Sequence, residues 1–237
     1  TGGSNTSVGA NALSANTTGA QNTAVGQAAG DALTVGSYNV ALGQNALSSD
    51  TQGSQSVAIG SSALFTQNFT SATAANNTAV GHGAGAAVTT GTENTLIGGL
   101  AGDAITTGVH NVATGTYALG ANTTGGQNVA IGRAALESNT TADNNTAVGN
   151  HALLSNTIGA NNTAVGINSQ VLVNSGAQNT SLGAYALQTT TTGTYNIGVG
   201  YNAVSTSATA SGQCTLGNGD ITNLRCNDTS ISSLSDS

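Results

Sequence analysis

Few side chains in this 237-residue sequence can act as acids, bases, nucleophiles or metal ligands. It has three histidines, two cysteines and nine carboxylates, against two arginines and no lysine. The histidines are His82, His110 and His151, and no two of them stand at a metal-ligand spacing. We therefore predict no metal site and no cofactor. Each histidine is expected to be exposed to solvent or to line an interface between chains.

The carboxylates give no clear catalytic pattern either. A glycosidase needs two carboxylates on either side of the scissile bond, and no pair at such a spacing stands out. A calcium-binding nonapeptide repeat, with its recurring aspartate, is also missing. The residues considered are Asp31, Asp50, Glu93, Asp103, Glu137, Asp143, Asp220 and Asp228. A polysaccharide depolymerase is therefore disfavoured, and we predict that the chain is not an enzyme.

A short motif that occurs thirteen times organises the chain. The first copy is N-T-S-V-G at residues 5–9, and later copies begin at residues 22, 39, 56, 77, 94, 111, 128, 145, 162, 179, 196 and 213. Every step is 17 residues except the one from 56 to 77, which is 21. The consensus is N-T-A-V-G-x-x-A-L-x-x-N-T-T-G-x-x, numbered here as positions 1 to 17. A fixed period predicts stacked repeats, and 17 residues fit one coil of a β-solenoid with two or three short strands.

The motif itself reads as a strand that is apolar on both faces. Positions 2 and 4 carry β-branched or aliphatic residues on one face, and position 3, usually alanine, lies on the other. We expect the alanine face to point away from the coil's own core and to be covered by other chains. The alternative is a monomer whose alanine face is exposed, because small apolar side chains are tolerated on surfaces.

The glycine and asparagine positions of the repeat agree with this interpretation. Glycine fills position 5 in all thirteen copies and position 15 in many, so we expect both positions to be corners with positive φ. Asparagine at position 1 is expected to form a hydrogen-bonded ladder along the stack. The sequence has no proline, which would remove N–H donors from a parallel ladder. The predicted fold is all-β, a parallel β-solenoid or β-roll with 17-residue coils that forms an intertwined homotrimer.

The predicted domains are a repetitive shaft, residues 1–217, and a junction, residues 218–237. Residues 1–4 match positions 14 to 17, which suggests a longer parent protein with coils or another domain upstream. The four extra residues fall within 65–73, where both phenylalanines lie, and predict a loop on one face of the solenoid. This loop is either a binding element or a tolerated bulge whose rings cover the adjacent coils.

Composition restricts the partners. The net charge is −7, so binding to nucleic acid is disfavoured. No apolar run is long enough to span a bilayer, so no membrane insertion is predicted. We expect Cys214 and Cys226 to be small buried hydrophobes rather than a disulfide pair. The tyrosines stand beside turns and could stack on sugars or pack on the surface; they are Tyr38, Tyr117, Tyr185, Tyr195 and Tyr201.

The end of the chain resembles a known junction. T-L-G-N at 215–218, L-R-C at 224–226 and T-S-I-S-S-L-S-D at 229–236 look like the segment that leads, in bacteriophage tail fibres and tailspikes, into a C-terminal intramolecular chaperone of the endosialidase type. In that family the chaperone begins S-D-x-R-x-K. By resemblance Ser235 is the self-cleaving nucleophile and Asp236 follows the scissile bond, whereas the arginine and lysine would lie past residue 237.

The repeats have a second resemblance. S-V-A-I-G at 56–60 is similar to the repeat of trimeric autotransporter adhesin heads, which are parallel β-rolls. Both resemblances imply a homotrimer. They imply a tail-fibre shaft in the virion, which presents host-binding surface to a bacterial glycan or protein receptor, or a bacterial adhesin head at the cell surface. An ice-binding solenoid is a further alternative, but Val35, Gln52, Ile158 and Ser175 interrupt the threonine column at position 14.

Overall fold

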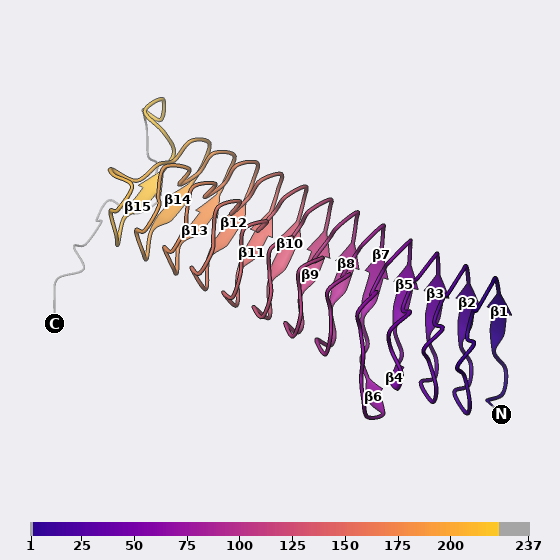
Figure 1. Ribbon diagram of the computed structural model, residues 1–237. Helices are drawn as coiled ribbons and strands as arrows, with labels where there is room; N and C mark the ends of the chain where they lie inside the picture. The colour runs from indigo at the N-terminus through magenta and orange to yellow at the C-terminus, as the bar shows by residue number, and fades with distance from the viewer. Residues whose placement is uncertain (1, 223–237) are drawn as a thin grey trace, which may run out of the picture.

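The protein is an elongated rod of stacked coils that turn gradually along its length (Figure 1). The computed structural model describes residues 2–222, which hold fifteen short strands and no helix. The strands are β1 (Thr6–Val8), β2 (Thr23–Val25), β3 (Val40–Leu42), β4 (Gly53–Ser54), β5 (Val57–Ile59), β6 (Thr73–Ala74), β7 (Thr78–Val80), β8 (Thr95–Ile97), β9 (Val112–Thr114), β10 (Val129–Ile131), β11 (Thr146–Val148), β12 (Thr163–Val165), β13 (Thr180–Leu182), β14 (Ile197–Val199) and β15 (Cys214–Leu216). The all-β solenoid predicted from the repeat is confirmed.

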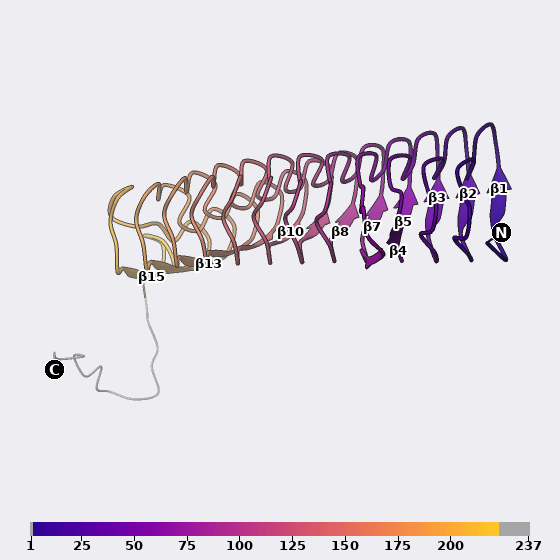
Figure 2. The same ribbon diagram turned by 60° about the horizontal axis from the view of Figure 1, so that its bottom comes forward.

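Thirteen strands form a single parallel sheet that runs the length of the rod (Figure 2). Each strand pairs with its equivalent in the next coil, so Thr146 lies opposite Thr163 and Val148 opposite Val165. The repeat that contains β5 is four residues longer than the others. The pairing of β5 with β7 nevertheless stays in register, since Val57 lies opposite Thr78. Each coil contributes one strand to this sheet rather than the two or three expected, and turns make up nearly all of the rest.

The two faces of the sheet are the reverse of our prediction. The position-3 side chains point into the coil and are fully buried, as Ala130 and Ala147 show, whereas positions 2 and 4 face outward. The narrow interior of the coil explains why alanine is usual at position 3. At Gly198, which replaces alanine at position 3, an added Cβ would lie 2.7 Å from Cγ of Leu187 at position 9. The coil interior is too narrow for a large residue at both positions.

One coil exchanges the two sizes. Leu96 takes position 3 and is fully buried, and the two neighbouring position-9 residues are Gly85 and Gly102. A Cβ at Gly85 or Gly102 would lie 2.7 or 2.8 Å from a Leu96 methyl carbon. The volume of the thin core is thus conserved by pairing a small residue at one position with a large one at the other.

Glycine at position 5 forms the corner that ends each strand, as predicted. From Gly9 to Gly200 its φ lies between +113° and +141°, a region open almost only to glycine. Position 15 differs from the prediction, because Gly19 and its equivalents have no positive φ. A Cβ on Gly19 would lie 2.3 Å from the carbonyl oxygen of Gly36 in the next coil, so close approach between coils favours glycine there, although Ala142 and Ala210 also occupy this position.

Other turn positions adopt left-handed backbone without glycine. Positive φ occurs at positions 7, 9 and 17, where asparagine, leucine, glutamine and tyrosine are common. The buried position-9 leucines include Leu47, Leu119, Leu136 and Leu153, each with φ between +52° and +54°. Burial of these side chains offsets the cost of about 1–2 kcal/mol for left-handed backbone.

The asparagine ladder at position 1 is confirmed. Each asparagine side-chain oxygen in the ladder accepts a hydrogen bond of 2.8–3.1 Å from the backbone N–H of the position-1 residue in the next coil, as Oδ1 of Asn128 does from the N–H of Asn145. Its amide donates to the position-15 carbonyl of its own repeat, as from Asn128 to Ala142 (2.8 Å). Nearly all of these buried amides are satisfied in two directions and link consecutive coils; Nδ2 of Asn145 is the exception and has no partner.

The extra residues are held by a buried polar cluster. Asp50 is fully buried; its Oδ1 accepts from the backbone N–H groups of Gly53 (2.9 Å) and Phe69 (3.1 Å), and its Oδ2 from Gln67 Nε2 (2.6 Å). Phe69 is buried, which supports the packing interpretation of the insertion for that ring, whereas Phe65 is 39% exposed. The short strands β4 and β6 pair beside this insertion.

Candidate interaction surface

The outward face of the thirteen-stranded sheet is apolar along its length, and we name it the sheet face. It consists of positions 2 and 4, which hold only threonine, valine, isoleucine, leucine and one cysteine. The position-4 side chains that are 36–57% exposed are Val8, Val25, Ile59, Ile97, Ile131, Leu182, Val199 and Leu216. An apolar stripe this long on one side of a protein indicates a surface for association.

The shape of the sheet face restricts its partner. Its ridges repeat at each strand, roughly every 4.8 Å, over thirteen strands and about 60 Å. No position on it is charged. A face roughly 10 Å wide and 60 Å long offers about 600 Å² per chain, so a pair of such faces would bury on the order of 1,200 Å², within the range of stable protein interfaces.

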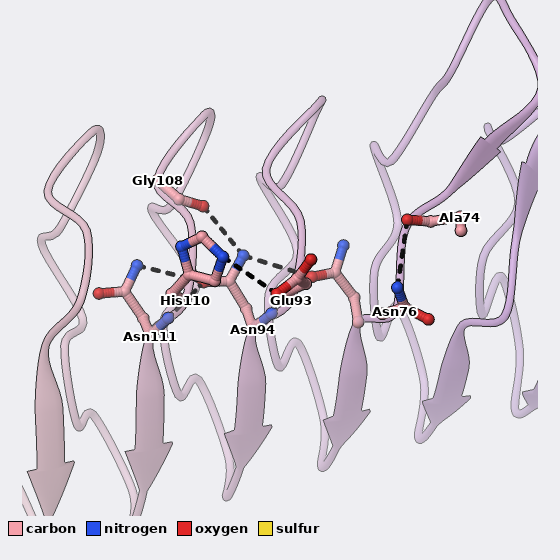
Figure 3. A network of polar contacts seen from close by, with 8 residues as sticks. Ala74, Asn76, Glu93, Asn94, Gly108, His110 and Asn111 are labelled. Carbon is pink, nitrogen blue, oxygen red and sulfur yellow. Dashed lines mark hydrogen bonds and ion pairs between the residues drawn. The ribbon is translucent and has the colours of Figure 1, made fainter.

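Two polar flanks border the sheet face. The leading flank, positions 16 and 17, precedes each strand, and the trailing flank, positions 6 and 7, follows it. On the leading flank Nε2 of His110 and Oε2 of Glu93 lie 3.0 Å apart, and both side chains are about half exposed (Figure 3). On the trailing flank Nη1 of Arg133 donates to Nε2 of His151 (2.7 Å). No histidine of the described residues joins a cluster suited to a metal ion.

A shallow hollow lies away from the sheet face, at position 10. Gly120 leaves a gap of about 340 Å³ between Asp103 in the coil before it and Glu137 in the coil after it, and Tyr117 lines one side. An atom at the Cβ position of Gly120 would be 3.6 Å from Oδ1 of Asp103 and 3.8 Å from Cγ of Glu137. The two acidic side chains therefore lean toward the same gap.

This arrangement corrects one reading of the sequence. Asp31, Asp103 and Glu137 all occupy position 10, so the carboxylates are less scattered over the repeat than their spacing first suggested. Partial burial raises the pKa of the Asp103 carboxyl, and a hydrogen bond involving its own backbone lowers it by less. The signal for the hollow was present in the sequence as two acids 34 residues apart, at 103 and 137, with glycine midway at 120.

The candidate self-cleavage residues, Ser235 and Asp236, lie outside the described residues, as do Cys226 and most of the junction. Cys214 is described, and the expectation that it is buried was wrong. It is an exposed free cysteine at position 2 of β15. The reason is the reversed sheet, because position 2 faces outward rather than into the coil.

The tyrosines beside the turns are largely exposed. Tyr38, Tyr195 and Tyr201 are each at least 58% exposed. Tyr185 and Tyr201 stand in consecutive coils with ring centroids 5.8 Å apart in an edge-to-face arrangement. This pair is packed surface, whereas the isolated rings at Tyr38 and Tyr195 remain open to a ligand.

Residues 2–222 contain no helix that is long and apolar enough to cross a membrane. The features a ligand or partner could meet are thus the sheet face, its two flanks, the position-10 hollow and the exposed tyrosines. No protein-family model, curated protein or solved structure matches this chain.

Proposed function

We propose that this chain is a structural shaft and host-surface attachment segment of a bacteriophage tail fibre or tailspike, and that it works as a homotrimer. The observation that carries the proposal is the sheet face, an uncharged stripe of aliphatic and threonine side chains along the rod. A stack of coils that binds its own kind along its length gives a stiff element of the kind a fibre needs. The resemblance of the repeats and of residues 215–236 to tail-fibre sequences supports the same assignment.

The partner proposed for the sheet face is a second and a third copy of the same chain. A partner must match ridges spaced at the strand distance over thirteen strands, and an identical coil stack has that spacing by construction. Three sheet faces around one axis would bury the position-4 residues against one another. A monomer would leave this stripe in water, at a cost of about 25 cal/mol per Å² of apolar surface.

The proposed place of the protein is the virion, outside the cell. Its partners besides itself would be a bacterial surface glycan or protein receptor, met by groups outside the trimer contact such as those at the position-10 hollow, Asp103 and Glu137. The alternative is the head of a bacterial trimeric adhesin at the cell surface. It rests on the S-V-A-I-G repeat at 56–60, whose Val57 and Ile59 lie on the sheet face. The one chemical step in the proposal is a single self-cleavage.

That step gives the first prediction, which separates a tail fibre from an adhesin. If the parent protein carries the chaperone, Ser235 Oγ attacks the carbonyl carbon of the Ser235–Asp236 bond while a lysine of the chaperone takes its proton and passes it to the departing Asp236 nitrogen. Water then hydrolyses the ester that forms, so the chain is cut after Ser235. Expression through the natural C-terminus should then yield two fragments, and Ser235→Ala should yield one. Intact-mass spectrometry measures both.

Ser233→Ala serves as the matched control and should leave processing unchanged. Unaltered cleavage in Ser235→Ala would remove Ser235 from the mechanism. A parent protein that stays in one piece and ends in a membrane anchor would instead favour the adhesin.

A further inference from the structure

The charged groups beside the sheet face are divided between its two flanks. Among residues 2–222 the trailing flank carries His82, Arg133 and His151 and no acid. The two acids of the flanks, Glu93 and Asp143, are both on the leading flank, which also carries His110 at 3.0 Å from Glu93. Arg133 is the only arginine or lysine in the described part of the chain, and it lies on the flank without acids.

The basic and acidic groups also share one spacing along the rod. Arg133 follows β10 and Asp143 precedes β11, and His82 follows β7 while Glu93 precedes β8. In both pairs the acid stands one coil closer to the C-terminal end than the base. Arg133 already leans in that direction, because the atom it donates to, Nε2 of His151, belongs to the coil of β11. The guanidinium therefore reaches the level of Asp143.

Within one chain these pairs cannot meet. The leading and trailing flanks stand on opposite sides of a strand, and the intervening positions 17 to 5 span roughly 20 Å of extended backbone. Arg133 and Asp143 are both exposed. Oδ1 of Asp143 accepts from the backbone N–H of Gly126 (2.6 Å), which holds the carboxylate on the leading flank.

Two sheet faces can meet in two orientations, and the charges distinguish them. If copies are related by rotation about the rod axis, the trailing flank of one lies beside the leading flank of the next. If one rod is turned end for end about its strand direction, trailing meets trailing and leading meets leading. The first orientation brings bases to acids, and the second brings like charges together.

We infer that Arg133 binds Asp143 of the neighbouring copy, that His82 lies beside the Glu93–His110 pair of that copy, and that these contacts select parallel chains in register. The inference rests on the self-association proposed above and adds its orientation and its register. An exposed ion pair contributes little to affinity. Its value here is that a shift by one coil, which leaves the periodic sheet faces equally well packed, separates both pairs at once.

The test is thiol cross-linking of the whole 237-residue chain. With Cys214→Ser and Cys226→Ser as background, Arg133→Cys and Asp143→Cys are combined and the protein is treated with a short bismaleimide linker, because an Arg–Asp ion pair holds its Cα atoms farther apart than the roughly 7 Å that a direct disulfide spans. We expect covalent dimers and trimers on a denaturing gel, because only neighbouring copies bring these two positions within reach of the linker.

The matched control is Arg133→Cys with Gln178→Cys, which lies on the same flank but precedes β13. We expect the first pair to give at least about fivefold more cross-linked product than the control, since the yield follows the local concentration of the partner thiol. Equal yields, or none from the first pair, in a protein that light scattering shows to be an oligomer would overturn the inference and leave the shaft proposal intact. A monomer by light scattering would defeat the shaft proposal itself.

Charge reversal gives a second readout that does not depend on cysteines. Arg133→Glu should lower the oligomeric fraction in dilute protein at low salt, and adding Asp143→Arg should restore it. Failure of the second change to restore association would contradict a direct contact between the two positions.

Discussion

Gly98→Ala is expected to destabilise the solenoid severely. Gly98 has φ of +136°, and a Cβ there would lie 2.7 Å from the carbonyl carbon and oxygen of Gly115 in the next coil. Backbone cannot yield as a flexible side chain can, so the backbone strain and the overlap together should cost about 3 kcal/mol or more. Thermal unfolding followed by circular dichroism should show a midpoint lower by roughly 6–12 °C, or no folded protein at all.

The neighbouring residue provides the control. Gly99 has no positive φ, and nothing lies within 4 Å of the Cβ it would gain. Gly99→Ala should therefore leave the unfolding temperature nearly unchanged or raise it slightly, because alanine restricts the unfolded chain. Equal effects of the two substitutions would mean that the coil spacing at position 5 is wrong.

A single charge on the sheet face should dissociate the assembly without unfolding the chain. Ile131 is 40% exposed in β10, so Ile131→Asp leaves a solvated carboxylate in an isolated chain. In a parallel trimer three such carboxylates would meet near one axis in an apolar interface, at a cost of several kcal/mol. We expect a monomer of 22.7 kDa with an unchanged far-ultraviolet circular dichroism spectrum.

Thr124→Asp is the matched control. Thr124 occupies position 14, away from the sheet face, and is exposed. The same charge there should leave the oligomer intact. If Ile131→Asp stays associated as the unmodified chain does, the sheet face is not the contact.

The coil architecture was predictable because it rests on periodicity. Thirteen glycines in register and an unbroken apolar alternation leave few folds other than a parallel solenoid. Alternation, however, identifies two faces and does not say which one is inside. Aliphatic residues at positions 2 and 4 favoured the wrong face, since larger apolar side chains are usually the buried ones.

The size exchange at Leu96 was the signal that would have decided the question. Leu96 takes position 3 in the repeat whose position 9 is Gly102, and position 9 of the repeat before it is Gly85. Most other repeats have leucine at position 9. Such compensation is expected only between residues that share one interior. With position 3 inside, the exposed aliphatic stripe and the exposed Cys214 follow directly.

The flank charges and the position-10 hollow were harder to anticipate. Each depends on which side chains of different coils lie side by side. To predict that, one must know the conformation of the turns between the strands as well as the length of the repeat. The left-handed backbone at positions 7, 9 and 17 sets that turn, and it often occurs at leucine, glutamine and tyrosine, which do not mark such a turn in a sequence.

The central claim is that the sheet face is covered by two further copies of the chain. Light scattering coupled to size exclusion measures this directly on the unmodified protein over a range of concentrations. The account requires a particle of three times 22.7 kDa that persists on dilution. A mass of 22.7 kDa at every concentration would contradict it.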